Sequence, residues 1–181
     1  MKILYISGSH RKKSNVNLLL KHAKEITGGD FLQLSDYDIK YCNECWNCLQ
    51  TDKCSLLDDM TNVLIPKLLE ADAIILGTPV FFNNVSARLK NFIDRTWCIK
   101  GGLRDKIGGI IVVGRAYGHQ STIDAITSFY LKHEIIPANR GVSGFGHVYG
   151  DILQDVEAIN GTENLVKRIV YLLNKLNKNK N

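Results

Sequence analysis

The sequence predicts an α/β protein with a doubly wound parallel sheet of five strands, in the order 2-1-3-4-5, between two helical layers. Apolar runs rich in β-branched residues alternate along the chain with segments of helical spacing. Several of these runs, including residues 3–6, 74–76 and 110–113, are apolar at consecutive positions. Strands of this kind are covered on both faces, as in a parallel sheet between helices.

The expected elements follow in chain order. We expect strands at residues 2–7, 31–34, 73–78, 107–113 and around 142–145. One apolar helical stripe runs from Val16 to Ile26, and another from Leu165 to Leu176. A third helix is expected over residues 59–70, after two acidic residues that suit a helix N-terminus. A fourth carries Lys90, Asp94 and Arg95.

Length and composition favour one domain spanning residues 1–181, since the chain is 45% hydrophobic. No stretch of about 18 uncharged apolar residues occurs, so we expect a cytoplasmic protein without a membrane partner. The net charge of +5 is concentrated at residues 11–13 and in a C-terminal helix ending in a basic tail at 175–180. The tail has no aromatic residues to stack on bases, so we predict no nucleic-acid partner; a basic binding module with zinc in a loop is the least favoured alternative.

The first expected strand runs into a loop of small polar residues, 8–15, ahead of a helix that begins near Val16. Backbone N–H groups, side-chain donors and the positive end of the helix dipole meet there, and a phosphate fits such a place. Neither a Walker loop nor a G-x-G-x-x-G fingerprint is present. A plain capped turn, in which Ser14 or Asn15 serves only the helix, is equally consistent with this loop.

The third and fourth strands run into loops that suit a planar ring with polar edges. Residues 77–86 place Phe81 and Phe82 beside two asparagines, although both phenylalanines could instead belong to the core. Residues 114–120 contain Gly114 and Gly118, which allow close backbone approach. The carboxyl ends of parallel strands share one edge of the sheet, so the three loops are expected to converge on one crevice.

Four of the five cysteines lie in one short loop, residues 41–55, with the spacing C-x2-C-x2-C-x5-C. This compact run favours a [4Fe–4S] cluster over a structural zinc site, which more often uses two separated knuckles. Vacant thiols are a third possibility. The predicted ligands are Cys42, Cys45, Cys48 and Cys54, with Tyr41, Trp46 and Leu49 shielding them from water. Cys98 has no cysteine neighbour in sequence and is interpreted as a buried structural thiol.

The segments Gly8-Ser9-x-Arg11, 79–95 and Gly114-x-x-x-Gly118-His119-Gln120 resemble the NADPH-dependent FMN reductase family of flavodoxin-like proteins, over roughly the first 150 residues. The cysteine loop narrows the resemblance to archaeal-type iron–sulfur flavoproteins. Cluster-free members of the family can show a similar cysteine pattern ahead of an acidic pair. The resemblance implies FMN as cofactor, with its phosphate at Ser9, Arg11, Ser14, Asn15 and Val16. It implies a ring site lined by Pro79, Val80, Phe81, Phe82, Asn83, Asn84 and Val85 and closed by Gly114, Tyr117, Gly118 and His119.

This chain departs from the family pattern at two places. Ser14 and Val16 replace the usual Gly and Thr, which removes one hydroxyl donor to the phosphate. Phe81 or Phe82 and Asn83 replace the usual Tyr and Gly, which changes the polarity beside the ring.

These observations predict an electron-transfer oxidoreductase in which FMN and the cluster carry the chemistry and no side chain is catalytic. The resemblance implies a ferredoxin-like electron donor and a small acceptor such as oxygen, peroxide or a quinone. The alternative is an NAD(P)H-dependent FMN or quinone reductase without a cluster. We expect a homodimer or homotetramer, because a long cysteine loop has little core of its own.

Overall fold

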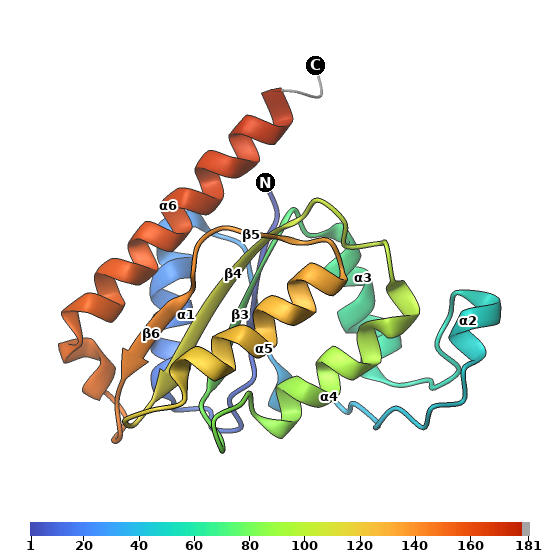
Figure 1. The fold of residues 1–181 in the computed structure, drawn as a ribbon, viewed down its shortest axis with the longest axis horizontal. Helices are drawn as coiled ribbons and strands as arrows, with labels where there is room; N and C mark the ends of the chain where they lie inside the picture. Colours follow the sequence, from blue (N-terminus) through green and yellow to red (C-terminus); the bar gives the residue numbers. More distant parts are fainter. Residues whose placement is uncertain (179–181) are drawn as a thin grey trace.

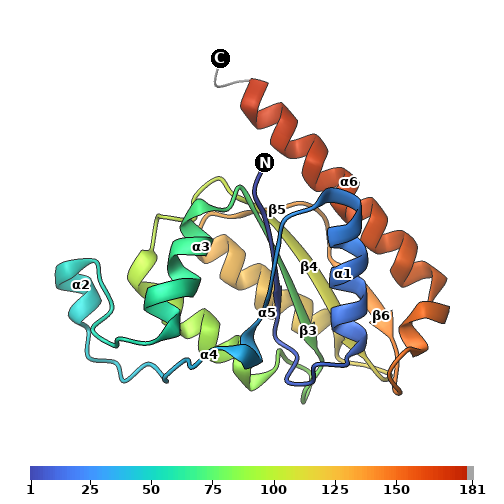
Figure 2. The ribbon, with the colours of Figure 1, turned by 180° about the vertical axis from the view of Figure 1, so that it is seen from behind.

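The computed structural model describes residues 1–178 and has three layers, a twisted sheet with helices on both faces (Figures 1 and 2). The strands are β1 (Ile3–Ser7), β2 (Asp30–Gln33), β3 (Ala73–Pro79), β4 (Ile107–Gly114), β5 (Ile136–Pro137) and β6 (Val142–Phe145). All neighbouring strands are parallel, in the order β2-β1-β3-β4-β5, and β6 also pairs with β4. The doubly wound α/β architecture and the predicted strand order are confirmed.

The prediction of five strands was wrong, because the edge of the sheet beside β4 is divided between two short strands. β5 pairs with the start of β4 and β6 with its end. β5 ends at Pro137, which has no N–H to donate, and Gly141, whose φ is +90°, lies just before β6. These residues interrupt one path along β4 and leave two separate pieces.

The helices cover the sheet in two groups. On one face lie α1 (Asn15–Thr27) and α6 (Val156–Lys178); on the other lie α3 (Ile65–Glu70), α4 (Ala87–Arg95) and α5 (His119–Lys132). Alternate residues of β1 belong to the two faces, since Ile3 and Tyr5 pack in one core cluster while Leu4 and Ile6 pack in the other. This alternation is why the strand is apolar at consecutive positions.

The helix expected over 59–70 has two parts, because Met60–Leu64 forms a π-helical turn before α3. The cysteine loop contains one short helix, α2 (Asn47–Thr51), which buries no residue and projects from the body of the molecule (Figure 1). Within residues 1–178, no helix has the length and apolar character needed to cross a membrane. Residues 179–181, which include the end of the predicted basic tail at 175–180, lie outside the described part of the chain.

Candidate functional site

The loops after β1, β3 and β4 meet at the carboxyl edge of the sheet. Gly8 N–H donates to the Gly77 carbonyl at 2.7 Å, and Ser86 Oγ donates to the Gly8 carbonyl at 2.7 Å, which ties the first loop to the third. Ser121 Oγ donates to the Asn83 carbonyl at 2.6 Å, which ties the third loop to the start of α5. The three loops therefore form one continuous surface.

A network of buried polar side chains supports the backbone of the first loop. Asn17 Nδ2 donates to the Lys12 carbonyl at 2.9 Å and to Gln33 Oε1 at 3.0 Å. Gln33 Nε2 donates to the Arg11 carbonyl at 3.1 Å, and Ser7 Oγ donates to Asn17 Oδ1 at 2.5 Å. Buried amides of this kind hold backbone in one conformation, because leaving them unpaired is costly. Sequence analysis did not single out Asn17 or Gln33, although a polar residue within an apolar stripe was an available signal.

Several predicted phosphate residues are engaged within the protein. Ser14 Oγ accepts from Asn17 N–H at 3.1 Å and so caps α1, as the simpler interpretation of this loop expected. The Asn15 amide fixes a distant loop, donating to the Val148 carbonyl at 2.9 Å and accepting from Gly150 N–H at 2.8 Å. Ser9 Oγ accepts from Arg11 N–H at 3.3 Å. Val16 is buried, whereas Arg11 is exposed to solvent.

The third loop is a tight turn that presents aromatic side chains. Phe81 and Asn84 exchange backbone hydrogen bonds of 2.9 and 3.0 Å, and the residues between them have φ values of +48° at Phe82 and +59° at Asn83. Positive φ is costly for a bulky side chain, and such strain concentrates at functional sites. Phe82 is fully exposed and Phe81 half exposed, whereas Val85 is buried and Pro79 and Val80 are half-buried. The turn thus holds an uncovered aromatic ring at the sheet edge.

The fourth loop packs against the third at its glycines. A Cβ at Gly118 would lie 2.5 Å from Asn83 Oδ1, and one at Gly114 would lie 2.9 Å from Val80 Cγ2. Tyr117 is exposed on the same loop. His119 instead points into the protein, where its Nε2 donates to the Gly144 carbonyl at 2.9 Å. Its ring also packs 4.4 Å from that of Phe145, so His119 anchors the loop to β6.

The cysteine loop borders a second site, a cavity of about 760 Å³ between this loop, α4 and α5. All five cysteines line it: Cys42 and Cys45 are exposed, Cys48 and Cys54 are partly buried, and Cys98 is buried as predicted. Burial, followed by the nearby Cys54 and Cys48, raises the pKa of the Cys98 thiol to about 11. A hydrogen bond with Ser55 lowers the pKa of the exposed Cys45 thiol.

The four loop thiols are of the donor type that iron–sulfur clusters use, and they border one cavity. Across residues 1–178, no three histidine, cysteine or acidic side chains meet closely enough to hold a single metal ion. A [4Fe–4S] cluster does not need its thiolates to meet at one ion, because each of its four irons binds one thiolate and the four cysteine sulfurs surround the cluster. Tyr41, Trp46 and Leu49, which were expected to shield the site, are all exposed in the single chain.

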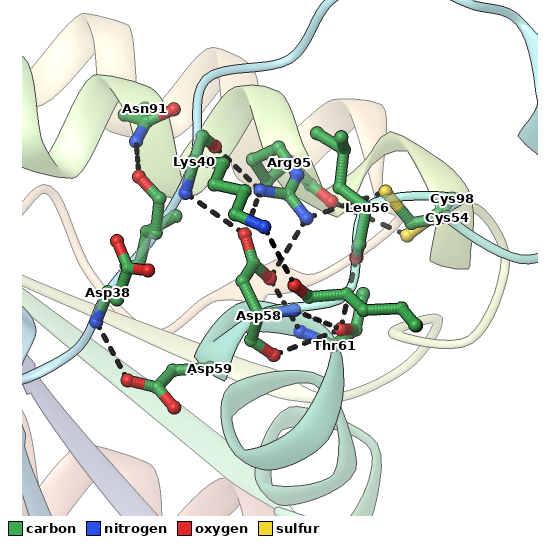
Figure 3. Close-up of polar contacts among 12 residues, drawn as sticks. Asp38, Lys40, Cys54, Leu56, Asp58, Asp59, Thr61, Asn91, Arg95 and Cys98 are labelled. Carbon is green, nitrogen blue, oxygen red and sulfur yellow. Dashed lines mark hydrogen bonds and ion pairs between the residues drawn. The ribbon is translucent and has the colours of Figure 1, made fainter.

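A buried ion pair fixes the base of the cysteine loop (Figure 3). Arg95 Nη1 lies 2.6 Å from Asp58 Oδ2, and neither side chain is exposed. Burial by itself would raise the pKa of Asp58, but hydrogen bonds from Arg95 and from Lys40 N–H outweigh it and lower that pKa. Arg95 and Asp58 are functional candidates that sequence analysis did not pair.

The fold and its edge loops define a flavodoxin-like class of protein, and comparison with known proteins specifies the family. The family model for NADPH-dependent FMN reductase matches residues 1–150. The chain therefore belongs to the NADPH-dependent FMN reductase family, a family of flavin-dependent oxidoreductases, and the predicted resemblance is confirmed.

Individual relatives agree with this assignment. An iron–sulfur flavoprotein of Methanocaldococcus jannaschii is 36% identical over 98% of this chain and 100% of its own length. The solved structure of RosB with bound 8-demethyl-8-formylriboflavin-5'-phosphate has a TM-score of 0.81 at 15% identity, covering 98% of this chain and 81% of that one. A flavodoxin-type, WrbA-like protein of Agrobacterium tumefaciens has a TM-score of 0.57 at 13% identity, covering 92% and 98%. At these identities the two structures show the fold alone.

Proposed function

We propose that this protein is an electron-transfer oxidoreductase that holds FMN at the three-loop edge and a [4Fe–4S] cluster at Cys42, Cys45, Cys48 and Cys54. The observation that carries the proposal is the convergence of the loops after β1, β3 and β4 on one surface, with four thiols bordering one cavity nearby. When bound, FMN accepts one or two electrons, whereas the cluster exchanges one electron at a time. The two groups together would let the protein pass electrons between a two-electron partner and a one-electron partner.

The chain's own residues bind and orient these groups. The backbone of residues 9–16, shaped by the amides of Asn17 and Gln33, supports a phosphate at the start of α1. The strained turn at Phe82 and the exposed Tyr117 offer aromatic surface to a planar ring, and Gly114 and Gly118 allow the backbone to approach it.

One helix joins the two sites. α4 begins directly after the third loop, where Ser86 caps it, and ends at Arg95 beside the cysteine loop. Its nine residues span about 13 Å. A rigid element of this length keeps the ring-binding loop and the thiols at a fixed separation, as electron transfer between them requires.

We propose a ferredoxin-like donor and a small acceptor such as oxygen, peroxide or a quinone, as the family resemblance implies. The competing function is NAD(P)H-dependent flavin or quinone reduction without a cluster, which the family description favours. Mixing the oxidised protein anaerobically with NADPH separates the two. Rapid loss of flavin absorbance without a protein donor supports the competing function.

The experiment that tests the cluster is anaerobic purification followed by a visible spectrum and iron and sulfide determination. We expect about four irons and four sulfides per chain. Cys54→Ser is expected to lower both contents, and Cys98→Ser is the matched control, because Cys98 borders the same cavity but lies outside the loop. A yellow, iron-free wild-type protein would refute the cluster.

We also propose that the protein forms a homodimer or homotetramer in the cytoplasm. Tyr41 and Trp46 on the cysteine loop are exposed, and α2 has no buried residue, so a second chain covering this loop would remove apolar surface from water. Analytical ultracentrifugation of cluster-loaded protein tests this. A monomer that keeps its cluster and activity contradicts it.

A further inference from the structure

Arg95, the last residue of α4, is buried at the base of the cysteine loop and donates hydrogen bonds to Lys40, Asp58 and Cys54 (Figure 3). Its Nη1 and Nη2 donate to the two carboxylate oxygens of Asp58 at 2.6 and 3.1 Å. A buried guanidinium is tolerated only with such pairing, because its desolvation is otherwise too costly. The pair therefore fixes the position of the guanidinium closely.

The same guanidinium reaches the cysteine loop itself. Nη1 donates to the Lys40 carbonyl at 2.6 Å, and Nη2 donates to Cys54 Sγ at 3.4 Å. Lys40 and Asp58 lie just before and just after the loop at residues 41–55, and Asp58 Oδ2 also accepts from Lys40 N–H at 2.9 Å. Arg95 thus clamps both ends of the loop and touches one of its sulfurs.

We propose that Arg95 is a positioning residue for Cys54 and that its N–H···S hydrogen bond raises the reduction potential of the cluster held there. This inference rests on the proposed function, since it takes Cys54 as an iron ligand. Reduction adds negative charge to the cluster and its ligand sulfurs, and a donor aimed at a ligand sulfur stabilises the reduced state more than the oxidised one. Asp58 balances the charge of Arg95, so the effect comes from the N–H group directed at sulfur.

Arginine suits this role better than lysine would. Two nitrogens of the planar guanidinium donate hydrogen bonds at fixed angles to Asp58, Lys40 and Cys54. A lysine ammonium keeps the charge but carries its donors on one atom, and it cannot serve all three directions in the same geometry. Arg95→Lys is therefore expected to keep the ion pair with Asp58 and to lose the hydrogen bond to Cys54.

The experiment uses the full chain loaded with its cluster. Wild type, Arg95→Lys and the double variant Asp58→Leu with Arg95→Met are compared by iron and sulfide content, and by a dye-equilibrated redox titration followed by electron paramagnetic resonance. The double variant removes both charges, so no unpaired ion remains buried. Arg104→Lys is the matched control, because Arg104 pairs with Glu134 on the exposed surface.

We expect both Arg95 variants to bind the cluster and to be harder to reduce. The ratio of reduced to oxidised cluster at a fixed potential should fall about tenfold, which is about 59 mV for a one-electron couple. Arg104→Lys should match wild type. A folded, loaded Arg95→Lys or double variant with the wild-type potential would overturn the inference. A wild-type protein without iron and sulfide would instead refute the proposed function.

Discussion

The packing of Gly118 against the third loop makes one substitution a direct test of the proposed flavin site. Gly118 has a φ of +86°, and a Cβ there would lie 2.5 Å from Asn83 Oδ1 and 2.9 Å from both Asn83 Cα and Val80 Cγ1. Asn83 Cα is backbone and cannot rotate away. Gly118→Ala is therefore expected to push the third and fourth loops apart.

The size of the effect follows from two costs. An L-residue in the left-handed region costs about 1–2 kcal/mol. Overpacking a close contact costs about 1–3 kcal/mol more. If the two loops hold the flavin together, part of the second cost appears as weaker binding, and about 1.4 kcal/mol corresponds to a tenfold change in Kd. We expect Gly118→Ala to bind FMN at least about tenfold more weakly than wild type.

The matched control is Gly101→Ala. Gly101 has a φ of +82°, but nothing lies within 4 Å of a Cβ built there, so only the conformational cost remains. FMN binding is measured by quenching of flavin fluorescence on titration into flavin-free protein, and stability by urea unfolding. Gly101→Ala should lose stability and keep its FMN affinity. Equal FMN affinity in the two variants would refute the convergence of these loops on the flavin.

Three further predictions concern buried and reactive groups. Asp58→Asn should lower the free energy of unfolding by about 3–5 kcal/mol, because it leaves the buried Arg95 without its counter-ion. Glu134→Gln, in an exposed ion pair, should lower the free energy of unfolding far less, and urea titrations compare the two variants. Because the pKa of Asp58 is lower in the folded protein, its contribution to stability is fully present above the unfolded-state pKa of about 3.9. This contribution is lost as the pH falls through the folded-state pKa. A difference in unfolding free energy between wild type and Asp58→Asn that stays constant down to pH 2 would contradict the prediction. Burial, aided by the charge of Lys132, lowers the pKa of His133. The free energy of unfolding should therefore decrease as the pH falls below the unfolded-state pKa of about 6.5. If nuclear magnetic resonance showed the His133 ring titrating at or above pH 6.5, this prediction would be wrong. With a pKa of about 11, about one in a thousand Cys98 thiols is ionised at pH 8. Iodoacetamide added to iron-free protein should therefore modify the exposed Cys45 before the buried Cys98. Equal modification rates of the two cysteines, measured by mass spectrometry, would disprove the effect of burial on Cys98.

Much of the fold follows from local sequence patterns. The strands β1, β3 and β4 are apolar on consecutive residues because each supplies both core clusters, and this pattern is visible without a structure. The divided edge of the sheet was not visible, because β5 has only two residues and is defined by its pairing with β4. A strand this short carries no periodicity of its own.

The sequence by itself determined which residues are candidates for the site: glycine and amide residues follow three strands, and four cysteines share one loop. Only the tertiary structure decided what those residues contact. Asn15 binds a loop more than 130 positions away, His119 turns inward to Gly144, and Arg95 joins Asp58 and Cys54. The physical reason is that a polar side chain takes whichever partner the packing of distant elements brings within hydrogen-bonding distance, and spacing along the chain does not encode that partner.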